Sequence, residues 1–561
     1  MTDHPAPEPL PPARARLRPL LATLPALLPA LFFLGLVLSP PLNQDVAAVL
    51  SFAQRMVAGE PLYSQLIDVN PPLIFLLNLP AALLAAHTPL DGVWALLLLL
   101  LCFCALVFAL CLRLRPPGGP AERAMLIALP PLLLVLAGFD FGQREQIMAA
   151  AALPYLFLAE RRAQGTRTGG LLVATATTLA AVGFALKPHF LAVPALVEAV
   201  VLAAALRRGR LGPALRDPVP WGLLALWVAY AALIVFGFPD YFGRVVPLVW
   251  DHYVGLGGAS WWRVALTPQL FTAALTTVAA VLFAACGGTG AIGWLPRLAA
   301  AAMLGGLAAA LVQHKGWSYH VLPVWIWGGL LCGLALARAA DALMPARAAA
   351  RAAPMLAAGA CVALALLVMR GGEAPWREFN YRTAPVGRLA EWLEREAPDG
   401  RLLVLSPDIY PAYPALNYAE NRPVLRFMST WLLQAVYGTC PADGGRFRAP
   451  ADMGPAERFL FDAVAQDFAA ARPAAVLVSR DAGIPWCANQ PFDMLAYFSR
   501  HPRFAETWRG YYPAGEIDGY LLFERNAEAP PPPEPPAVPM VRRPGAPEPL
   551  AASDAPRRQR G

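Results

Sequence analysis

The sequence predicts an α-helical polytopic membrane protein with about eleven transmembrane spans, interfacial helices and a small C-terminal α/β domain. Of its 561 residues, 57% are hydrophobic and only 15% are charged, whereas about a quarter of the residues of a soluble protein are charged. Long apolar runs recur along the first two thirds of the chain. Arginines lie in short loops between these runs, so the net charge of +7 indicates membrane orientation, and no nucleic-acid partner is expected.

The apolar runs give the spans in chain order. A tail, residues 1–19, carries arginines ahead of an apolar stretch longer than the core of a signal peptide, which predicts an uncleaved first span. The membrane module covers residues 20–370, and its first outer loop covers 41–92. Run 73–86 is short, and counting it as a span would put the arginine-rich loops on the wrong side, so we expect a helix at the outer interface there. The predicted spans are 20–40, 93–112, 124–138, 146–159, 170–186, 190–206, 221–238, 269–288, 298–312, 321–337 and 352–369.

The distribution of basic residues predicts the orientation. The N-terminal tail and the loops that include 113–123, 160–169 and 207–217 hold most of the arginines of the module, and such loops stay in the cytoplasm. The opposite loops carry only Arg55, Arg144, Lys187, Arg244, Arg263 and Lys315. We therefore expect a multi-pass protein of a bacterial inner membrane. The expected periplasmic segments include 139–146, 313–320 and everything after residue 370.

The region after the last span reads as a small α/β domain, residues 371–526. Amphipathic spacing at Leu389, Trp392 and Leu393 predicts one helix and ERFLFDAVAQDFAAA another, while RLLVLS, AAVLVSRD and GYLLFER predict strands. The proline-rich tail, 527–561, is expected to be disordered.

Two cysteines, Cys440 and Cys487, lie outside the predicted spans. Because their domain is expected in an oxidising compartment, we predict a disulfide between them.

Ionisable residues gather at the outer ends of the spans. The chain has two lysines, Lys187 and Lys315, and both lie there, with Arg144 and Glu145 close to span ends. Such groups are costly in a membrane unless they face a cavity or one another. For any single residue the alternative is a solvated loop side chain, or a lysine that reaches the head groups. Together they predict a cavity for an anionic phosphate, beside a carboxylate that accepts a proton. Histidines in the same loops are His87, His189, His252, His314 and His320.

Four short stretches support a family resemblance. Asp45 and the following GEPLYSQLIDVNPPL resemble the first outer loop of the GT-C superfamily of membrane glycosyltransferases, which includes protein O-mannosyltransferases, lipid A aminoarabinose transferases and lipopolysaccharide core transferases. GQREQIM and HKGWSYHVLP also resemble motifs of bacterial members, and SPDIYPAYPALNYAENRP resembles their outer domain.

The resemblance implies an inverting glycosyltransferase that uses a polyprenyl-phosphate sugar donor and a lipid- or polysaccharide-linked acceptor. Asp45 is then the expected catalytic base, with Glu145 as the second candidate. The expected second-shell or acceptor residues are Asp68, Asn70 and His314. The residues expected to bind the donor phosphate are Arg144, Lys187, His189, Lys315 and His320. Gln44 stands where many relatives have a second acid, so a divalent metal stays open and no other cofactor is expected.

Two other functions stay open at this point. One is a transporter or flippase for lipid-linked sugars, although a transporter favours polar groups at mid-membrane and inverted repeats, and the sequence shows neither. The other is a non-catalytic scaffold that binds glycan through the outer domain, since the second acid beside Asp45 is missing.

Overall fold

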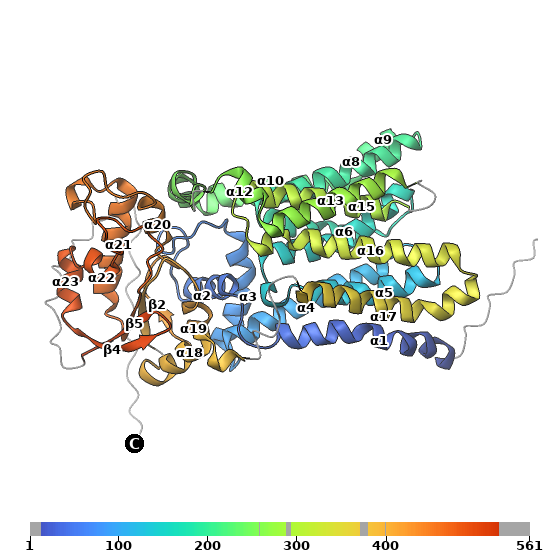
Figure 1. Cartoon of the computed structure of the whole chain (residues 1–561). Helices are drawn as coiled ribbons and strands as arrows, with labels where there is room; N and C mark the ends of the chain where they lie inside the picture. Colours follow the sequence, from blue (N-terminus) through green and yellow to red (C-terminus); the bar gives the residue numbers. More distant parts are fainter. Residues whose placement is uncertain (1–12, 257–258, 288–292, 371–379, 399, 527–561) are drawn as a thin grey trace, which may run out of the picture. The chain divides into compact units, whose positions relative to one another are not determined.

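The computed structural model describes residues 13–256, 259–287, 293–370, 380–398 and 400–526 (Figure 1). Side chains are described from residue 25 to residue 369 within these ranges and throughout the last two. The tail 527–561, predicted to be disordered, lies outside the described residues.

Most of the described chain is helical, and the long helices run side by side in one bundle (Figure 1). Seven helical stretches among the described residues are long and apolar enough to cross a membrane. They are Gly92–Leu114, Pro188–Arg207, Leu211–Gly237, Pro268–Cys286, Leu295–Val312, Ser318–Leu343 and Ala346–Met369. Large apolar side chains on their outer faces, such as Phe236, are exposed, which requires an apolar environment.

The bundle has the following long helices. They are α1 (Ala13–Val37), α4 (Gly92–Leu114), α5 (Pro120–Val135), α6 (Arg144–Gln164), α7 (Gly170–Ala185), α8 (Ala192–Arg207), α10 (Pro218–Gly237), α13 (Pro268–Cys286), α15 (Leu295–Val312), α16 (Leu322–Leu343) and α17 (Ala346–Arg370). Helix α6 packs against α4, α7, α8, α15 and α16, and nearly all its residues from Arg144 to Glu160 are buried. A helix enclosed by others needs no apolar face toward lipid, so α6 can carry charged residues at both ends.

The first outer loop forms two helices, α2 (Gln44–Val57) and α3 (Leu73–His87), which pack against each other and against α4. Helix α3 covers the run 73–86, where a helix was expected, and its position at a membrane interface stays a prediction. A later segment, residues 241–256, is predicted to lie on the outer side and is called the outer segment. It has π-helical hydrogen bonding over Tyr241–Val245 and Val249–Tyr253, with α11 (Val246–Leu248) between them, and α12 (Trp261–Ala265) follows it.

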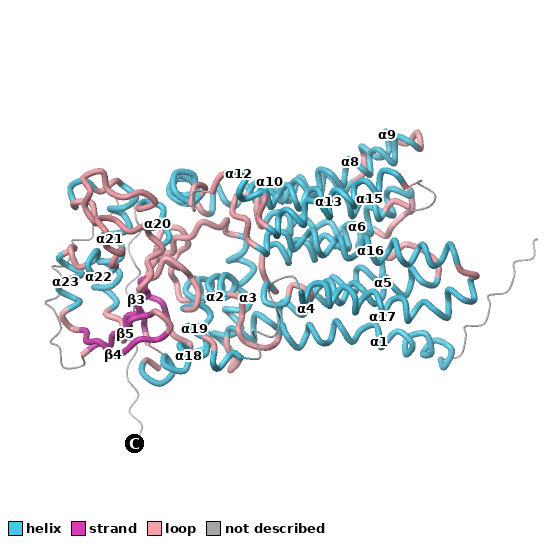
Figure 2. The backbone as a smooth tube through the Cα atoms, viewed as in Figure 1, coloured by secondary structure: helices cyan, strands magenta, loops and turns pink. Residues whose placement is uncertain are grey.

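The C-terminal region contains a five-stranded mixed sheet in the order β2-β1-β3-β5-β4, shown in magenta in Figure 2. Its strands are β1 (Arg401–Leu405), β2 (Arg422–Pro423), β3 (Ala475–Ser479), β4 (Tyr511–Ile517) and β5 (Tyr520–Arg525). The pairs β1–β2 and β1–β3 are parallel, and β5 is antiparallel to both β3 and β4. The three predicted strands are confirmed as β1, β3 and β5.

Helices cover both faces of this sheet. They are α18 (Pro385–Glu396), α19 (Ala412–Tyr418), α20 (Trp431–Val436), α21 (Pro455–Ala471), α22 (Met494–Phe498) and α23 (Pro502–Trp508). Alternation along β1 sends Leu402 and Val404 into a core continuous with the bundle, while Leu403 and Leu405 join a second core with α21. The two predicted helices of this region are confirmed as α18 and α21.

Hydrogen bonds to backbone carbonyls tie the first outer loop to the C-terminal region. The Ile67 N–H donates to the Arg426 carbonyl (2.6 Å), and Arg55 donates to the Leu425 carbonyl (2.6 Å). The Asn417 amide donates to the Ala47 carbonyl at the start of α2 (3.0 Å). The loop that carries Asp45 is therefore held by the bundle on one side and by the sheet region on the other.

Candidate functional site

Asp45 lies in the first turn of α2, where the helix dipole favours a carboxylate. Asn43 caps this helix, and its side chain accepts from the Asp45 N–H (2.9 Å). The Gln143 amide donates to both Asn43 Oδ1 and Asp45 Oδ2, each at 2.9 Å. Asp45 Oδ1 has no hydrogen-bond partner among the described residues, and Asp45 is half-buried. One carboxylate oxygen is thus fixed by Gln143, and the other makes no hydrogen bond with the described residues.

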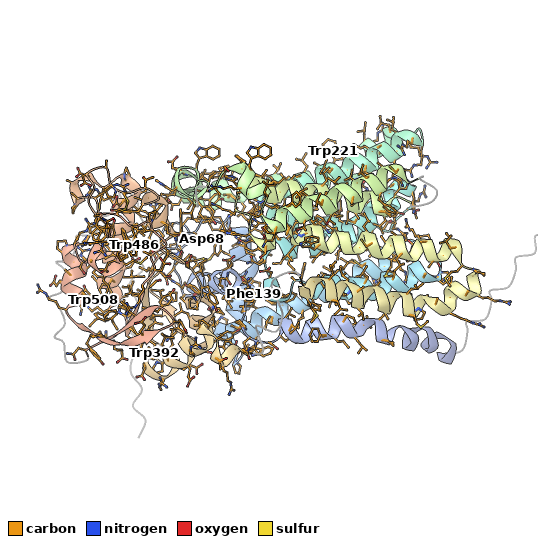
Figure 3. All side chains as sticks on the ribbon, in the orientation of Figure 1. Asp68, Phe139, Trp221, Trp392, Trp486 and Trp508 are labelled. Carbon is orange, nitrogen blue, oxygen red and sulfur yellow. A yellow bond between two sulfur atoms is a disulfide. The ribbon has the colours of Figure 1, made fainter. Side chains whose placement is uncertain are left out.

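Asp68 and Asn70 organise the turn that precedes Pro71-Pro72. The backbone and side-chain amides of Asn70 both donate to Asp68 Oδ1 (2.8 and 2.7 Å), and Asn70 Oδ1 accepts from the guanidinium of Arg144. Burial raises the pKa of Asp68, while the bonds from Asn70 and the charge of Arg144 act in the opposite direction. Figure 3 shows Asp68 near the end of the bundle that faces the sheet region, far from Trp221.

Glu145 and Lys187 form a buried ion pair next to Arg144. The Lys187 ammonium donates to Glu145 Oε1 (2.7 Å) and to Gln313 Oε1 (2.5 Å), and His320 Nε2 lies 4.0 Å from the same Glu145 oxygen. Glu145 is fully buried and its Oε2 has no hydrogen-bond partner among the described residues. A buried pair of this kind requires both members, because either charge alone is costly in a low dielectric.

Arg144 is the centre of the electrostatic cluster. Asp45, Asp68, Glu145 and Tyr319 all lie close enough to act on its charge. The structure thus brings together most of the residues predicted for the site. They are Asp45, Asp68, Asn70, Arg144, Glu145, Lys187, His189 and His320.

Lys315 lies apart from this cluster. Its ammonium donates to the carbonyls of Tyr253 (2.7 Å) and Leu256 (2.9 Å), and it stacks over the Tyr253 ring (4.7 Å). Partial burial lowers the pKa of Lys315 to about 8. A cation on terminal carbonyls caps a helical segment. In this structure Lys315 is therefore placed to hold the outer segment that ends near residue 256.

His314 is also outside the cluster. Its ring stacks on Trp261, with ring centroids 4.0 Å apart. Its place as a second-shell or acceptor residue stays a prediction.

The sequence reasoning missed the uncharged members of the site. Gln143 and Asn43 orient Asp45, Gln313 accepts from Lys187, and the Tyr319 ring lies 5.9 Å from the Lys187 ammonium. Charge patterns do not reveal amides and phenols. The motifs GQREQIM and HKGWSYHVLP held the available signals, because the first places Gln143 directly before Arg144 and Glu145 and the second contains Tyr319.

No group of three or more His, Cys, Asp and Glu side chains in the described ranges is arranged to hold a metal ion. Cys440 and Cys487 form a disulfide, the pair that the sequence analysis selects.

Chemically, the site offers a half-buried carboxylate with one free oxygen, next to a guanidinium whose charge is shared among several acids. This combination can remove a proton from a hydroxyl and bind an anion at the same place. Comparison with known proteins adds no further assignment, because no protein family, curated protein or solved structure matches this chain.

Proposed function

We propose that this protein is an inverting membrane glycosyltransferase of the GT-C type. It moves a sugar from a polyprenyl-phosphate donor to a hydroxyl of a lipid- or polysaccharide-linked acceptor. The observation that carries the proposal is the Asp45 carboxylate, held through Oδ2 by Gln143 and open at Oδ1, in the same cluster as Arg144.

In the proposed reaction, Asp45 accepts the proton of the acceptor hydroxyl while the hydroxyl oxygen bonds to the anomeric carbon of the donor sugar. The bond between that carbon and the phosphate oxygen breaks, and the electron pair leaves with polyprenyl phosphate. Arg144 stabilises the charge on the leaving phosphate, since a guanidinium matches phosphate geometry. Lys187 neutralises Glu145 and so keeps the guanidinium of Arg144 available to the phosphate.

The proposal includes a topology of eleven spans in a bacterial inner membrane. The four helices beyond the seven apolar ones, α1, α5, α6 and α7, belong to the same bundle, and α6 is enclosed by its neighbours. The proposed site and the C-terminal region then face the periplasm, in agreement with the arginine distribution.

The kinetic test compares two substitutions in the site. Asp45→Asn keeps size and hydrogen bonding but removes the proton acceptor, so turnover should fall by about a hundredfold or more with donor binding nearly unchanged. Arg144→Lys keeps the charge but removes the planar guanidinium group that can form two parallel hydrogen bonds to a phosphate, so it should raise the KM for the donor by about tenfold. Glu391→Gln, an exposed change on α18, is the control. Transfer by Asp45→Asn at the wild-type rate would remove Asp45 as the base.

A further inference from the structure

A cleft lies between the outer segment and the N-terminal end of α21. We call it the outer cleft. Its volume is about 690 Å³, which is in the range of small-molecule sites, about 300–1,000 Å³. Its ionisable lining residues are Arg244, Asp251, His252, Arg448, Asp452 and Glu457.

The charges of the outer cleft do not suit an anionic ligand. Arg448 donates to Glu457 Oε2 (3.0 Å) and the Val436 carbonyl (3.2 Å), so its charge is already paired. Arg244 donates to the Tyr63 and Ser64 carbonyls (3.2 and 3.3 Å). Carboxylates outnumber guanidinium groups in the lining, so the cleft disfavours phosphate and nucleic acid.

Two carboxylates of the outer cleft are free to accept hydrogen bonds. Asp251 and Asp452 are exposed, and their side chains make no hydrogen bond or ion pair with any described residue. An ionised carboxylate only accepts, so its natural partners are groups with O–H or N–H donors. The same cleft also has an apolar lining from Pro247, Leu248, Pro455 and Phe459.

We infer that the outer cleft binds a neutral segment of a glycan chain. A sugar ring presents hydroxyl donors around its edge and C–H groups on its faces. The free carboxylates match the hydroxyls, and the proline rings and Phe459 match the ring faces. The cleft volume of about 690 Å³ has room for more than one sugar ring, so we assign the cleft to a segment of a glycan chain.

A series of hydrogen bonds links the outer cleft to the proposed site. Arg244, in its lining, holds the carbonyls of Tyr63 and Ser64, and the Tyr63 hydroxyl donates to the Asn70 carbonyl (2.5 Å). Asn70 in turn accepts from Arg144. Through these bonds the outer cleft is coupled to the loop that shapes the site, and we identify a glycan in the cleft as the acceptor. That identification rests on the proposed function, whereas the binding of a glycan does not.

The test measures glycan binding to the full chain in lipid nanodiscs by isothermal titration calorimetry. The probe is the mixture of oligosaccharides released by mild acid from the cell envelope of a strain that lacks this gene. We expect wild type to bind, and the double variant Asp251→Asn/Asp452→Asn to bind at least tenfold more weakly. Gly454→Leu should act in the same way by filling the cleft, because a Cβ at Gly454 meets no heavy atom within 4 Å and the backbone tolerates it.

Glu506→Gln, an exposed change on α23, is the matched control and should bind like wild type. Absence of binding by wild type, or wild-type affinity in both cleft variants, overturns the inference. Failure of the proposed function gives a different result. The wild-type chain then binds the oligosaccharides and the cleft variants bind them more weakly, but the wild-type chain transfers no sugar to the oligosaccharides.

Discussion

At the scale of single residues, the position of Asp45 depends on Gln143. The Gln143 amide joins Asp45 to Asn43, and Asn43 donates to Asp140 (3.1 Å), so three polar side chains fix the carboxylate. We expect Gln143→Glu to lower kcat by about tenfold, because it removes the donor. A second carboxylate also makes the ionised form of Asp45 less favourable, so the acid limb of the pH–rate profile should move to higher pH.

Gln54→Glu provides the control for Gln143→Glu. Gln54 is an exposed residue of the same helix, α2, so the added charge is solvated and the pH–rate profile should match wild type. An unchanged acid limb in Gln143→Glu would show that Gln143 does not position the catalytic base.

The Lys187–Glu145 pair gives a prediction about stability. Lys187→Met leaves the fully buried Glu145 without its partner and should destabilise the protein by about 3–5 kcal/mol. The double variant Lys187→Met/Glu145→Gln removes both charges and should recover much of that loss in thermal unfolding of the purified protein.

The exposed pair Arg480–Glu516 is the control for the buried pair. Arg480→Met should change stability by less than about 1 kcal/mol, because a solvated pair contributes little. If the double variant unfolds at the same temperature as Lys187→Met, the account of the buried pair is wrong.

The two lysines show how far sequence reasoning reaches at this scale. Each lysine follows the end of a long helix, on the same side of the bundle, so the sequence alone gives both the same expected role. In the structure Lys187 meets Glu145, whereas Lys315 meets the backbone carbonyls of Tyr253 and Leu256. Backbone carbonyls leave no signature in the sequence, so the position of Lys315 outside the cluster could not be predicted.

At the scale of elements, Lys315 anchors the outer segment 241–256, which lines the outer cleft. Lys315→Met removes the cation from the carbonyls at the end of this segment, so amide hydrogen exchange over residues 249–256 should become faster. Arg263→Gln, an exposed change in α12, should leave exchange there unchanged. Equal protection in Lys315→Met and wild type would contradict the anchoring role.

The disulfide is the second element-scale feature. Cys440 and Cys487 are 47 residues apart, so the bond restricts a long loop of the unfolded chain. Replacing both with serine should destabilise the protein by about 2–4 kcal/mol, measured by thermal unfolding. Mass spectrometry of the non-reduced protein tests the bond directly, and two free thiols would contradict both the disulfide and the expected oxidising compartment.

The strands of the C-terminal sheet were predictable where most of their side chains are buried and apolar. Strands β1 and β3 are continuous apolar runs between covered faces, and β5 is nearly so. Strand β4 was missed because it is an edge strand with Pro513 and Gly515 in its interior, which weakens the strand pattern. The π-helical turns of the outer segment have no sequence signature of their own.

At the scale of the whole molecule, topology follows from charge. Position 164, at the end of α6, should face the cytoplasm, and position 420, after α19, the periplasm. Single cysteines at Gln164 and Glu420, in a background without the free cysteines, can be labelled in intact cells with a membrane-impermeant maleimide. Only position 420 should react, and external labelling of position 164 would overturn the orientation.

The apolar runs predicted a helical bundle with membrane-spanning helices, but not the polar interactions inside it. Helix α6 is not among the seven apolar stretches, and it carries charged residues at both ends that pair with side chains from other parts of the bundle. At its C-terminal end Arg162 pairs with Glu198 and Asp217, each at 2.7 Å. Such partners come from distant parts of the chain, and a single sequence does not show which ones meet.

The central claim is sugar transfer from a polyprenyl phosphate with Asp45 as the base. The most direct measurement compares lipid-linked sugars and envelope glycans, by mass spectrometry, in a deletion strain that expresses wild type, Asp45→Asn or nothing. We predict that the empty and Asp45→Asn strains accumulate the same polyprenyl-phosphate sugar and lose that sugar from one glycan, while wild type restores it. Restoration of the glycan by Asp45→Asn, or identical lipid-linked sugars and glycans in all three strains, would contradict the account.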